Sequence, residues 1–427
     1  MQQPRPRAPP ALPDHLVEQI LLRVRPDDPA TLARAALVCR RWRGIVADPA
    51  FRRGRLALHG GAPRMLGFLC DGQWDGDGIP YARFVPTSSC VPPSADHHGQ
   101  RAFDAHHGRV LLHGITRYDD LAVWDPITDK MVEVPRPPGS LGDRSKKATV
   151  LCAANGVCDH IDCHRGPFIV VLVGTNNDIV EVDVDNDYIE DGLDEADAYD
   201  IMWNGIRRIP KDMFACIYSS EFGSWSEPTY AEYPDDDVCW NRSALVGNAL
   251  YFVLRKFDRI LKYDLQTRKM STVRLPYVRT KMIFTDFVRI ELTAMEDGRL
   301  GFARVEESNE LCLWSRNEDN KVTRDEDYKV EGWTLYKVVD LKKLFPLVDS
   351  ITLKYCLVGF VEGVCVAFVV LENGLFTIDM KSELMKKVYE GHCMSFVAPY
   401  ISFCYPALEA SSRDDGPKVG TSSASNA

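Results

Sequence analysis

The side chains best suited to chemistry are concentrated in one short segment, CAANGVCDHIDCH, which contains Cys152, Cys158, His160, Cys163 and His164. Thiolates and imidazoles are the ligands that proteins use most often for zinc. The segment lacks the paired C-x-x-C spacing that is typical of structural zinc sites. We therefore expect no metal site here, and no cofactor elsewhere.

The remaining reactive side chains form no recognisable catalytic pattern. The pairs His97-His98 and His106-His107 are unsuited to a shared site, because neighbours on a strand point to opposite faces of a sheet. The sequence contains no GxGxxG, P-loop or GxSxG motif. Its carboxylates stand in no arrangement that marks an acid and base pair. We expect no catalytic residues and a protein that is not an enzyme.

The composition is that of an ordinary folded protein with more than one domain. The 427 residues are 45% hydrophobic and 26% charged, and this length suggests two or three domains. A net charge of -10 argues against a broad positive surface for nucleic acid. The longest nearly apolar run, Tyr355 to Leu371, is too short to cross a bilayer. We expect neither a nucleic-acid nor a membrane partner.

The cysteines and the start of the chain indicate a reducing environment. The thirteen cysteines follow no framework spacing, and the first residues contain no apolar stretch that could act as a signal peptide. These features predict free thiols and a location in the cytoplasm, the nucleus or both.

Charge divides the chain into two unlike parts. Residues 1–60 hold eleven arginines and five acidic residues, a net of +6, which leaves 40 basic and 56 acidic residues, a net of -16, for the rest. Such an asymmetry suggests two domains with different partners.

The basic part is predicted to be helical after a disordered leader, residues 1–11. Apolar residues recur at helical spacing from Leu16 onward, and the pairs Asp28-Pro29 and Asp48-Pro49 are typical helix starts. Residues 12–55 therefore form a predicted three-helix unit. A unit of this size buries too little surface to be stable alone, so it must contact the next domain or a partner.

The rest of the chain is predicted to be a β-propeller, residues 56–408. A glycine, two short strands and an aromatic-Asp turn recur, with the aspartate sixteen or seventeen residues after the glycine; the clearest examples end at Asp125, Asp264 and Asp379. Such repeats fit about six blades, possibly seven, of about 50 residues each. An acidic insertion, about 177–212, and a disordered tail, 409–427, complete this organisation.

The helical segment LPDHLVEQILLRVRPDDPATLARAALVCRRWRGIVADPAFRR resembles the F-box, the module that docks proteins onto the Skp adaptor of cullin-based ubiquitin ligases. The resemblance implies an apolar contact with a Skp-family adaptor and, through it, with a cullin. The residues expected to make that contact are Leu12, Pro13, Leu16, Ile20, Leu21, Leu37, Val38, Cys39 and Trp42.

Segments such as GPFIVVLVGTN and YSSEFGSWSEP are similar to the kelch-like, F-box-associated region of plant, especially cereal-type, F-box proteins. This resemblance implies that the propeller selects a target protein for ubiquitination. The sequence leaves three alternatives open: a Skp-binding scaffold without a ligase role, a ligand-binding propeller, and helices that only cap the propeller.

Overall fold

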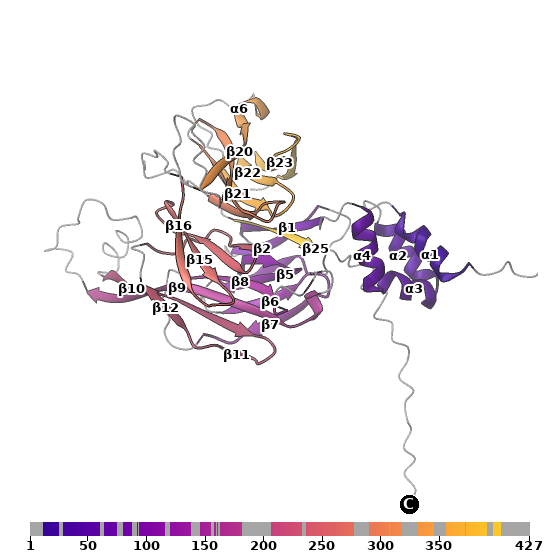
Figure 1. Ribbon diagram of the computed structural model, residues 1–427, viewed down its shortest axis with the longest axis horizontal. Coiled ribbons are helices and arrows are strands. Elements are labelled where there is room, and N and C mark those ends of the chain that lie inside the picture. Colours follow the sequence, from indigo (N-terminus) through magenta and orange to yellow (C-terminus); the bar gives the residue numbers. More distant parts are fainter. Residues whose placement is uncertain are drawn as a thin grey trace, which may run out of the picture.

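A computed structural model places a small helical unit beside a ring of β-sheets (Figure 1). It describes the following residues: 12–24, 29–59, 64–74, 80–87, 92, 94–115, 120–137, 146–154, 158, 160, 163–181, 206–232, 236–276, 290–306, 308–317, 332–345, 356–371, 373–390 and 396–402. The expected leader, the tail and the middle of the acidic insertion lie outside these residues.

The helical unit contains four helices where three were expected: α1 (Asp14–Leu22), α2 (Pro29–Val38), α3 (Arg40–Ala47) and α4 (Pro49–Leu58). The predicted second helix is broken at Cys39, whose backbone is extended and whose thiol accepts a hydrogen bond from the Trp42 amide. Asp48 caps α4 by accepting from the Ala50 amide, and Pro49 starts that helix. The expected last turn is thus a full helix that passes residue 55.

The helices share one small core. Its buried members come from all four helices: Val17, Leu21, Leu32, Ala35, Ala36, Val46 and Phe51. Arg55 donates to the Val24 carbonyl at 2.9 Å and a His59 ring nitrogen lies 2.8 Å from the Leu22 carbonyl, which ties α4 to the end of α1.

The remainder of the chain forms six antiparallel sheets, which confirms the expected propeller and sets its blade number at six. Blade 1 combines β1 (Arg64–Trp74), β2 (Pro80–Pro86) and β3 (Asp96–His98) with β25 (Val397–Ser402). Blade 2 contains β4 (Gln100–His106), β5 (Arg109–Gly114), β6 (Leu121–Asp125) and β7 (Lys130–Val134). Blade 3 contains β8 (Lys146–Cys152), β9 (Phe168–Glu181), β10 (Ile206–Ser219), β11 (Ser224–Trp225) and β12 (Thr229–Glu232), with a short 3-10 helix, η1 (Cys163–Arg165), before β9.

The last three blades are each built from consecutive strands. Blade 4 contains β13 (Ala244–Val246), β14 (Ala249–Val253), β15 (Arg259–Asp264) and β16 (Met270–Arg274). Blade 5 contains β17 (Ile290–Ala294), β18 (Leu300–Val305), β19 (Glu310–Arg316) and β20 (Trp333–Asp340), followed by the short helix α6 (Leu341–Leu344). Blade 6 contains β21 (Cys356–Val361), β22 (Val366–Leu371), β23 (Gly374–Asp379) and β24 (Met385–Tyr389).

The ring is closed by pairing the two ends of the domain. Strand β25 pairs antiparallel with β1, so that blade 1 takes one strand from the C-terminal side and three from the N-terminal side. Six apolar clusters fill the spaces between neighbouring blades, one for each adjacent pair. Because each blade buries both faces against its neighbours, the sheets stabilise one another around the whole circle.

The repeated aspartates have the same structural role in three blades. Asp125, Asp264 and Asp379 each end a strand and accept, through Oδ1, hydrogen bonds from the amides two and three residues later. The fourth residue after each aspartate has a φ of 55–57°, and its amide bonds back to the aspartate carbonyl at 2.8 Å. The sequence repeat therefore corresponds to the same hairpin turn in each of these blades, which explains the constant spacing of the aspartates.

Two boundaries differ from the expectation. Strands β9 and β10 pair from Ile169 with Ser219 as far as Glu181 with Ile206, so the hairpin extends into both ends of the predicted insertion 177–212. The helical unit ends at Leu58 and β1 begins at Arg64, so the expected boundary at residue 55 falls inside α4.

Most of the described cysteines are free, as expected: Cys39, Cys152, Cys158, Cys163, Cys216, Cys239, Cys312, Cys356 and Cys365. Cys70 differs, since it is disulfide-bonded. Within the described part of the chain, no helix has the length and apolar character needed to span a membrane.

Candidate functional site

Helix α1 has a buried face and an exposed apolar face. Val17 and Leu21 are 1% and 4% exposed and pack into the helical core. Leu16 and Ile20, one residue earlier in each turn, are 41% and 54% exposed. Since the core is complete without them, these two side chains are available to another protein.

A second exposed apolar group lies where α2 meets α3. The extended backbone at Cys39 ends α2 abruptly, and the last two helical residues, Leu37 and Val38, are 66% and 64% exposed. Cys39 itself is also exposed. Ala35 and Ala36 of the same helix face the core, so Leu37 and Val38 lie on its exposed side.

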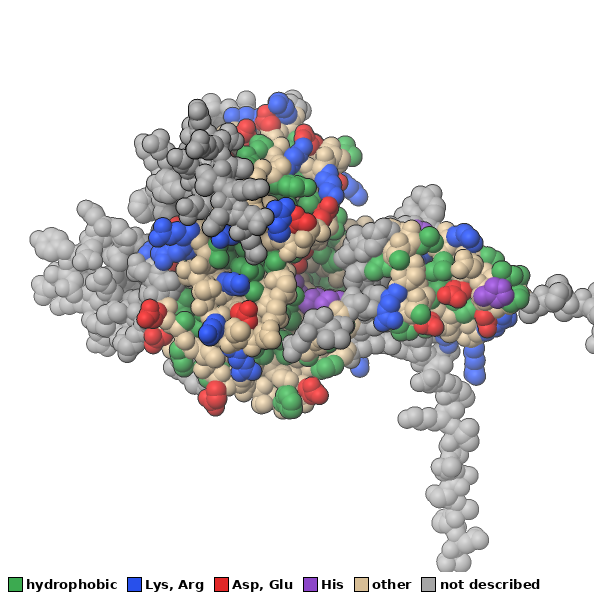
Figure 2. Space-filling view, viewed as in Figure 1, with side chains coloured by type: hydrophobic (Ala, Val, Ile, Leu, Met, Phe, Trp, Pro, Cys, Tyr) green, Lys and Arg blue, Asp and Glu red, His purple; other side chains and the backbone are tan. Residues whose placement is uncertain are grey.

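Arg41 brings the two groups onto neighbouring parts of the helical unit. Its guanidinium forms an ion pair with Asp14 at the start of α1 and donates to the Leu12 carbonyl at 2.6 Å. The start of α1 is thereby fixed beside the start of α3. We call the exposed residues together the docking surface: Leu12, Pro13, Leu16, Ile20, Leu37, Val38 and Cys39. Figure 2 shows hydrophobic side chains on this helical unit interspersed with charged ones.

Two of the nine expected contact residues lie elsewhere. Leu21 is part of the core, and Trp42 is half-buried against it. Leu21 is therefore buried, and Trp42 is exposed only in part. Sequence reasoning also missed Leu58, which is 58% exposed on α4, because the helical unit was expected to end at residue 55.

The centre of the propeller holds buried charged side chains. Asp104 of blade 2 is fully buried, with its Oδ1 3.2 Å from the Arg242 Nε and its Oδ2 2.6 Å from the Ser243 hydroxyl, both just before blade 4. Arg242 donates in turn to the Phe360 carbonyl of blade 6 at 3.1 Å. Contacts between blades that are not neighbours must cross the ring, so this group lies on its axis.

The central charges perturb one another's protonation. Burial acts to raise the pKa of Asp104, but His106, Arg242 and Lys147 outweigh it and hold that pKa well below its usual value. Burial acts to lower the pKa of His106, but the carboxylates of Asp104 and Glu362 outweigh it and raise that pKa. Burial lowers the pKa of Lys147 to about 8.

This central network has the character of a clamp. The Asp104 carboxylate and the Arg242 guanidinium bond to each other, to the Ser243 hydroxyl and to backbone groups of blades 2 and 6. Groups that are hydrogen-bonded in this way hold the blades in fixed positions relative to one another and are not free to act on a ligand. A ligand-binding propeller, one of the alternatives, therefore gains no support from its centre.

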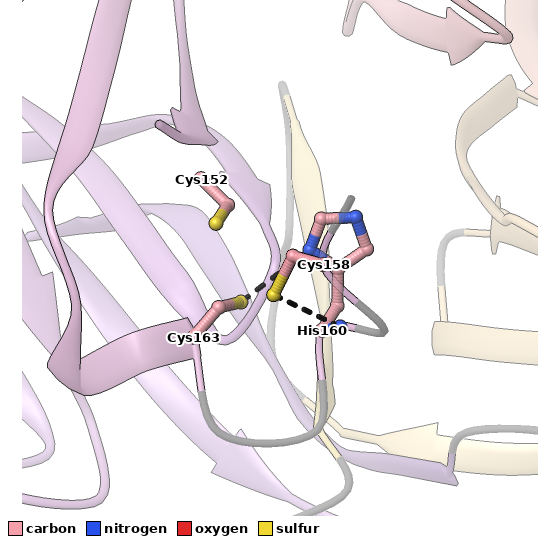
Figure 3. A group of neighbouring side chains, drawn as sticks. All are labelled: Cys152, Cys158, His160 and Cys163. Atoms are coloured by element: carbon pink, nitrogen blue, oxygen red, sulfur yellow. Dashed lines mark hydrogen bonds between the residues drawn. The ribbon is translucent and has the colours of Figure 1, made fainter. Parts of the chain in front are cut away.

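The CAANGVCDHIDCH segment gathers four of its five candidate side chains at one place next to blade 2, and His164 is not among them. One ligand atom from each of Cys152, Cys158, His160 and Cys163 lies within 4.8 Å of the others. Figure 3 shows the three sulfur atoms and the imidazole facing a common space. Cys152 ends β8, Cys163 begins η1, and the other two lie on the connection between them.

Sequence reasoning missed this arrangement because it sought paired C-x-x-C motifs. The fold supplies the pairing instead, since the end of β8 and the start of η1 come together. One signal was present: His160 and Cys163 are separated by two residues, the spacing that places two ligands on one turn.

The following aromatic side chains of the propeller are either buried between blades or partly exposed. Trp124, Tyr263 and Trp314 occupy equivalent blade positions and are buried in the clusters between blades. Trp333 is also buried, and its indole donates to the Arg274 carbonyl at 2.8 Å. Trp240 is 45% exposed, and Trp225 is partly exposed.

Comparison with solved structures finds only low similarity, with TM-scores below 0.5 for the three chains that follow. The WD40 domain of SCAP from fission yeast has 10% identity and a TM-score of 0.31, over 72% of this chain and 54% of that one, so this chain spans about half its length. The SapL1 lectin in complex with alpha methyl fucoside has 9% identity and a TM-score of 0.34, over 77% and 97%. An oligogalacturonate lyase in complex with manganese has 9% identity and a TM-score of 0.37, over 76% and 74%.

Comparison with protein families is more specific. No curated protein matches the chain significantly. An F-box-like family model matches residues 10–55, the helical unit that carries the docking surface. A second model, described as "F-box protein AT5G49610-like, beta-propeller", matches residues 191–407, which is half of the chain. The chain therefore belongs to the F-box proteins with an AT5G49610-like β-propeller.

Proposed function

We propose that this protein is the substrate-recognition subunit of an SCF-type (Skp-cullin-F-box) ubiquitin ligase. The helical unit binds a Skp-family adaptor and, through it, a cullin, while the propeller binds a target protein. The single observation that carries this proposal is the docking surface, an exposed apolar area on an F-box-like unit whose own core is already closed.

The docking surface suits a protein partner. Exposed leucine and isoleucine side chains on so small a unit are costly in water, and a partner helix or groove would cover them. Residues 1–60, which include this surface, carry a net charge of +6, which favours an acidic partner and speeds its encounter. The cereal-type resemblance makes a plant adaptor the natural choice for experiments.

The propeller supplies a rigid platform and no bond chemistry of its own. Its ring is closed by β25, and its centre is held by the Asp104–Arg242 clamp. Recognition of a target would therefore take place on the loops and outer strands. The mechanism we propose is proximity, in which the bound target's lysines are held near a ubiquitin-charged enzyme elsewhere in the complex. Such a complex would act in the cytoplasm, the nucleus or both.

Co-purification of the full chain with a plant Skp adaptor and a cullin tests this proposal. The control lacks residues 1–60, because α4 ends at Leu58 and the deletion must remove the whole helical unit. We expect a stoichiometric complex with the full chain and none with the control. An adaptor complex that excludes the cullin would favour a scaffold instead. Absence of adaptor from both samples would refute the proposal and leave the propeller as an independent binding module.

A further inference from the structure

The cluster of Cys152, Cys158, His160 and Cys163 has no role in the proposed function. The three thiols are free, and they are supplied by two elements of blade 3 and the connection between them. We propose that these four side chains form a structural zinc site that holds the end of β8 and the start of η1 together within blade 3, next to blade 2.

The distances within the cluster fit one tetrahedral ion. With Zn–S bonds of about 2.3 Å and Zn–N bonds of about 2.0–2.1 Å, the edges of a zinc tetrahedron are about 3.5–3.8 Å. The Cys163 Sγ lies 3.5 Å from the His160 Nδ1, and all four ligand atoms lie within 4.8 Å of one another. An ion would need to draw the outermost atoms inward by about 1 Å.

The chemistry of the ligands favours zinc. Three thiolates with one imidazole make a Cys3His set, which is a common structural zinc site and has no open position for a substrate. Magnesium and calcium prefer oxygen ligands, and the cluster offers none. The site is therefore expected to be structural.

The surroundings supply the opposite charge that this set requires. Zinc with three thiolates and a neutral imidazole carries a single net negative charge. Arg109 lies beside the cluster, is 2% exposed, and donates to the carbonyls of Cys163 and Gly166. Among the described residues Arg109 has no ion pair, and its Nη1 atom is buried without a hydrogen-bond partner. A buried cation without a counter-ion is costly, and a negatively charged zinc centre next to it would provide one.

Neighbouring groups also fix the orientation of the ligands. The His107 ring stacks on His160 with centroids 3.6 Å apart and planes 3° apart. The His107 Nδ1 accepts a hydrogen bond from the Cys152 amide at 3.1 Å. His107 belongs to the β4–β5 turn of blade 2, so these contacts join the cluster to the neighbouring blade and hold its ligands in place, as the surroundings of metal sites commonly do.

Metal analysis of the full chain, purified without a histidine tag, tests the proposal. We expect elemental mass spectrometry to find one zinc ion per chain. The test variant is Cys158→Ser/His160→Asn; Cys158 is partly exposed, and asparagine tolerates the left-handed backbone of His160, whose φ is 57°. The control is Cys356→Ser, a partly exposed free cysteine in β21 of blade 6.

The expected outcomes separate a zinc site from a chance cluster. The test variant should retain less than a tenth of the zinc, while the control keeps one ion per chain. A chelator should lower the melting temperature of the wild type and the control but leave that of the test variant unchanged. Cobalt in place of zinc should give the visible absorption of a tetrahedral thiolate site. Full zinc content in the test variant, iron in place of zinc, or a metal-free chain whose melting temperature ignores added zinc would overturn the proposal.

Discussion

The central clamp of the propeller makes a quantitative prediction about stability. Asp104 is fully buried, and its Oδ1 lies 3.2 Å from the Nε of Arg242, which is 2% exposed. At an effective dielectric constant of about 20, two unit charges at that distance attract by about 5 kcal/mol. Removing one partner leaves the other charge buried and uncompensated, which typically costs about 3–5 kcal/mol.

The variant Asp104→Asn tests this charge term directly. Asparagine has the same shape and can still accept from the Ser243 hydroxyl, but it cannot neutralise Arg242. We expect the free energy of unfolding to fall by about 3 kcal/mol or more, a large part of the 5–15 kcal/mol that stabilises a typical protein. Urea unfolding, followed by the fluorescence of the buried Trp124 and Trp314, measures the loss.

Two further variants serve as controls. Asp120→Asn breaks the surface pair of Asp120 with Arg136 in the same blade, where both side chains are about half exposed, and should cost at most about 1 kcal/mol. Asp104→Asn/Arg242→Met removes both buried charges and should be more stable than Asp104→Asn alone. If Asp104→Asn costs no more than Asp120→Asn, the clamp interpretation is wrong.

Three other predictions concern single residues. Burial raises the pKa of Asp71 to about 7, so between about pH 4 and 7 the folded state binds a proton that the unfolded state has lost. The free energy of unfolding should therefore fall as the pH rises through that range. Asp71→Asn should unfold at a higher urea concentration than wild type at pH 8 but not at pH 4. A β-carbon at Gly301 would collide with the Met295 side chain and lie 2.9 Å from the Trp314 carbonyl, so Gly301→Ala should lower the free energy of unfolding by about 1–3 kcal/mol. Gly44 has open space around it on helix α3, so Gly44→Ala should raise the free energy of unfolding by about 0.5–1 kcal/mol in the same urea assay. Leu21→Ala should lower the unfolding temperature of the helical unit as well as adaptor binding, because Leu21 is 4% exposed in the core; unchanged calorimetric melting would contradict this placement.

The architecture could be predicted because it is repeated along the chain. The aspartates at 125, 264 and 379 each require the same hairpin turn, so their spacing reveals the blades without any knowledge of long-range contacts. The closing strand β25 has no such signal, since its partner β1 lies more than 300 residues away and pairs through backbone groups. Every non-proline residue carries the same backbone donor and acceptor, so the pairing of two distant strands leaves little trace in the sequence.

The exposure of most of the expected contact residues was predictable in outline, but the buried and exposed faces of each helix were not. Helical periodicity gave Leu16 and Ile20 the same weight as Leu21, although Leu21 is buried and the other two are exposed. The difference depends on the angle at which α1 packs on α3 and α4. Side-chain spacing within one helix does not determine that angle.

The long-range polar contacts could not be predicted from the sequence, because they too depend on how distant segments pack. Asp104 and Arg242 are separated by 138 residues, and neither lies in a motif. The cysteine segment is local, but its ligands converge only because β8 and η1 fold back on each other.

Adaptor binding by the docking surface is measured by the Kd of the full chain for a Skp-family adaptor, with Leu37→Ala compared with Leu384→Ala. Leu37 is 66% exposed on the docking surface, and Leu384 is 72% exposed on blade 6, so the two variants remove the same side chain at similar exposure. The account predicts that Leu37→Ala weakens binding by about 2 kcal/mol, roughly 30-fold in Kd, and that Leu384→Ala leaves Kd unchanged. Equal Kd values for wild type and Leu37→Ala, or an equal loss in both variants, would contradict it.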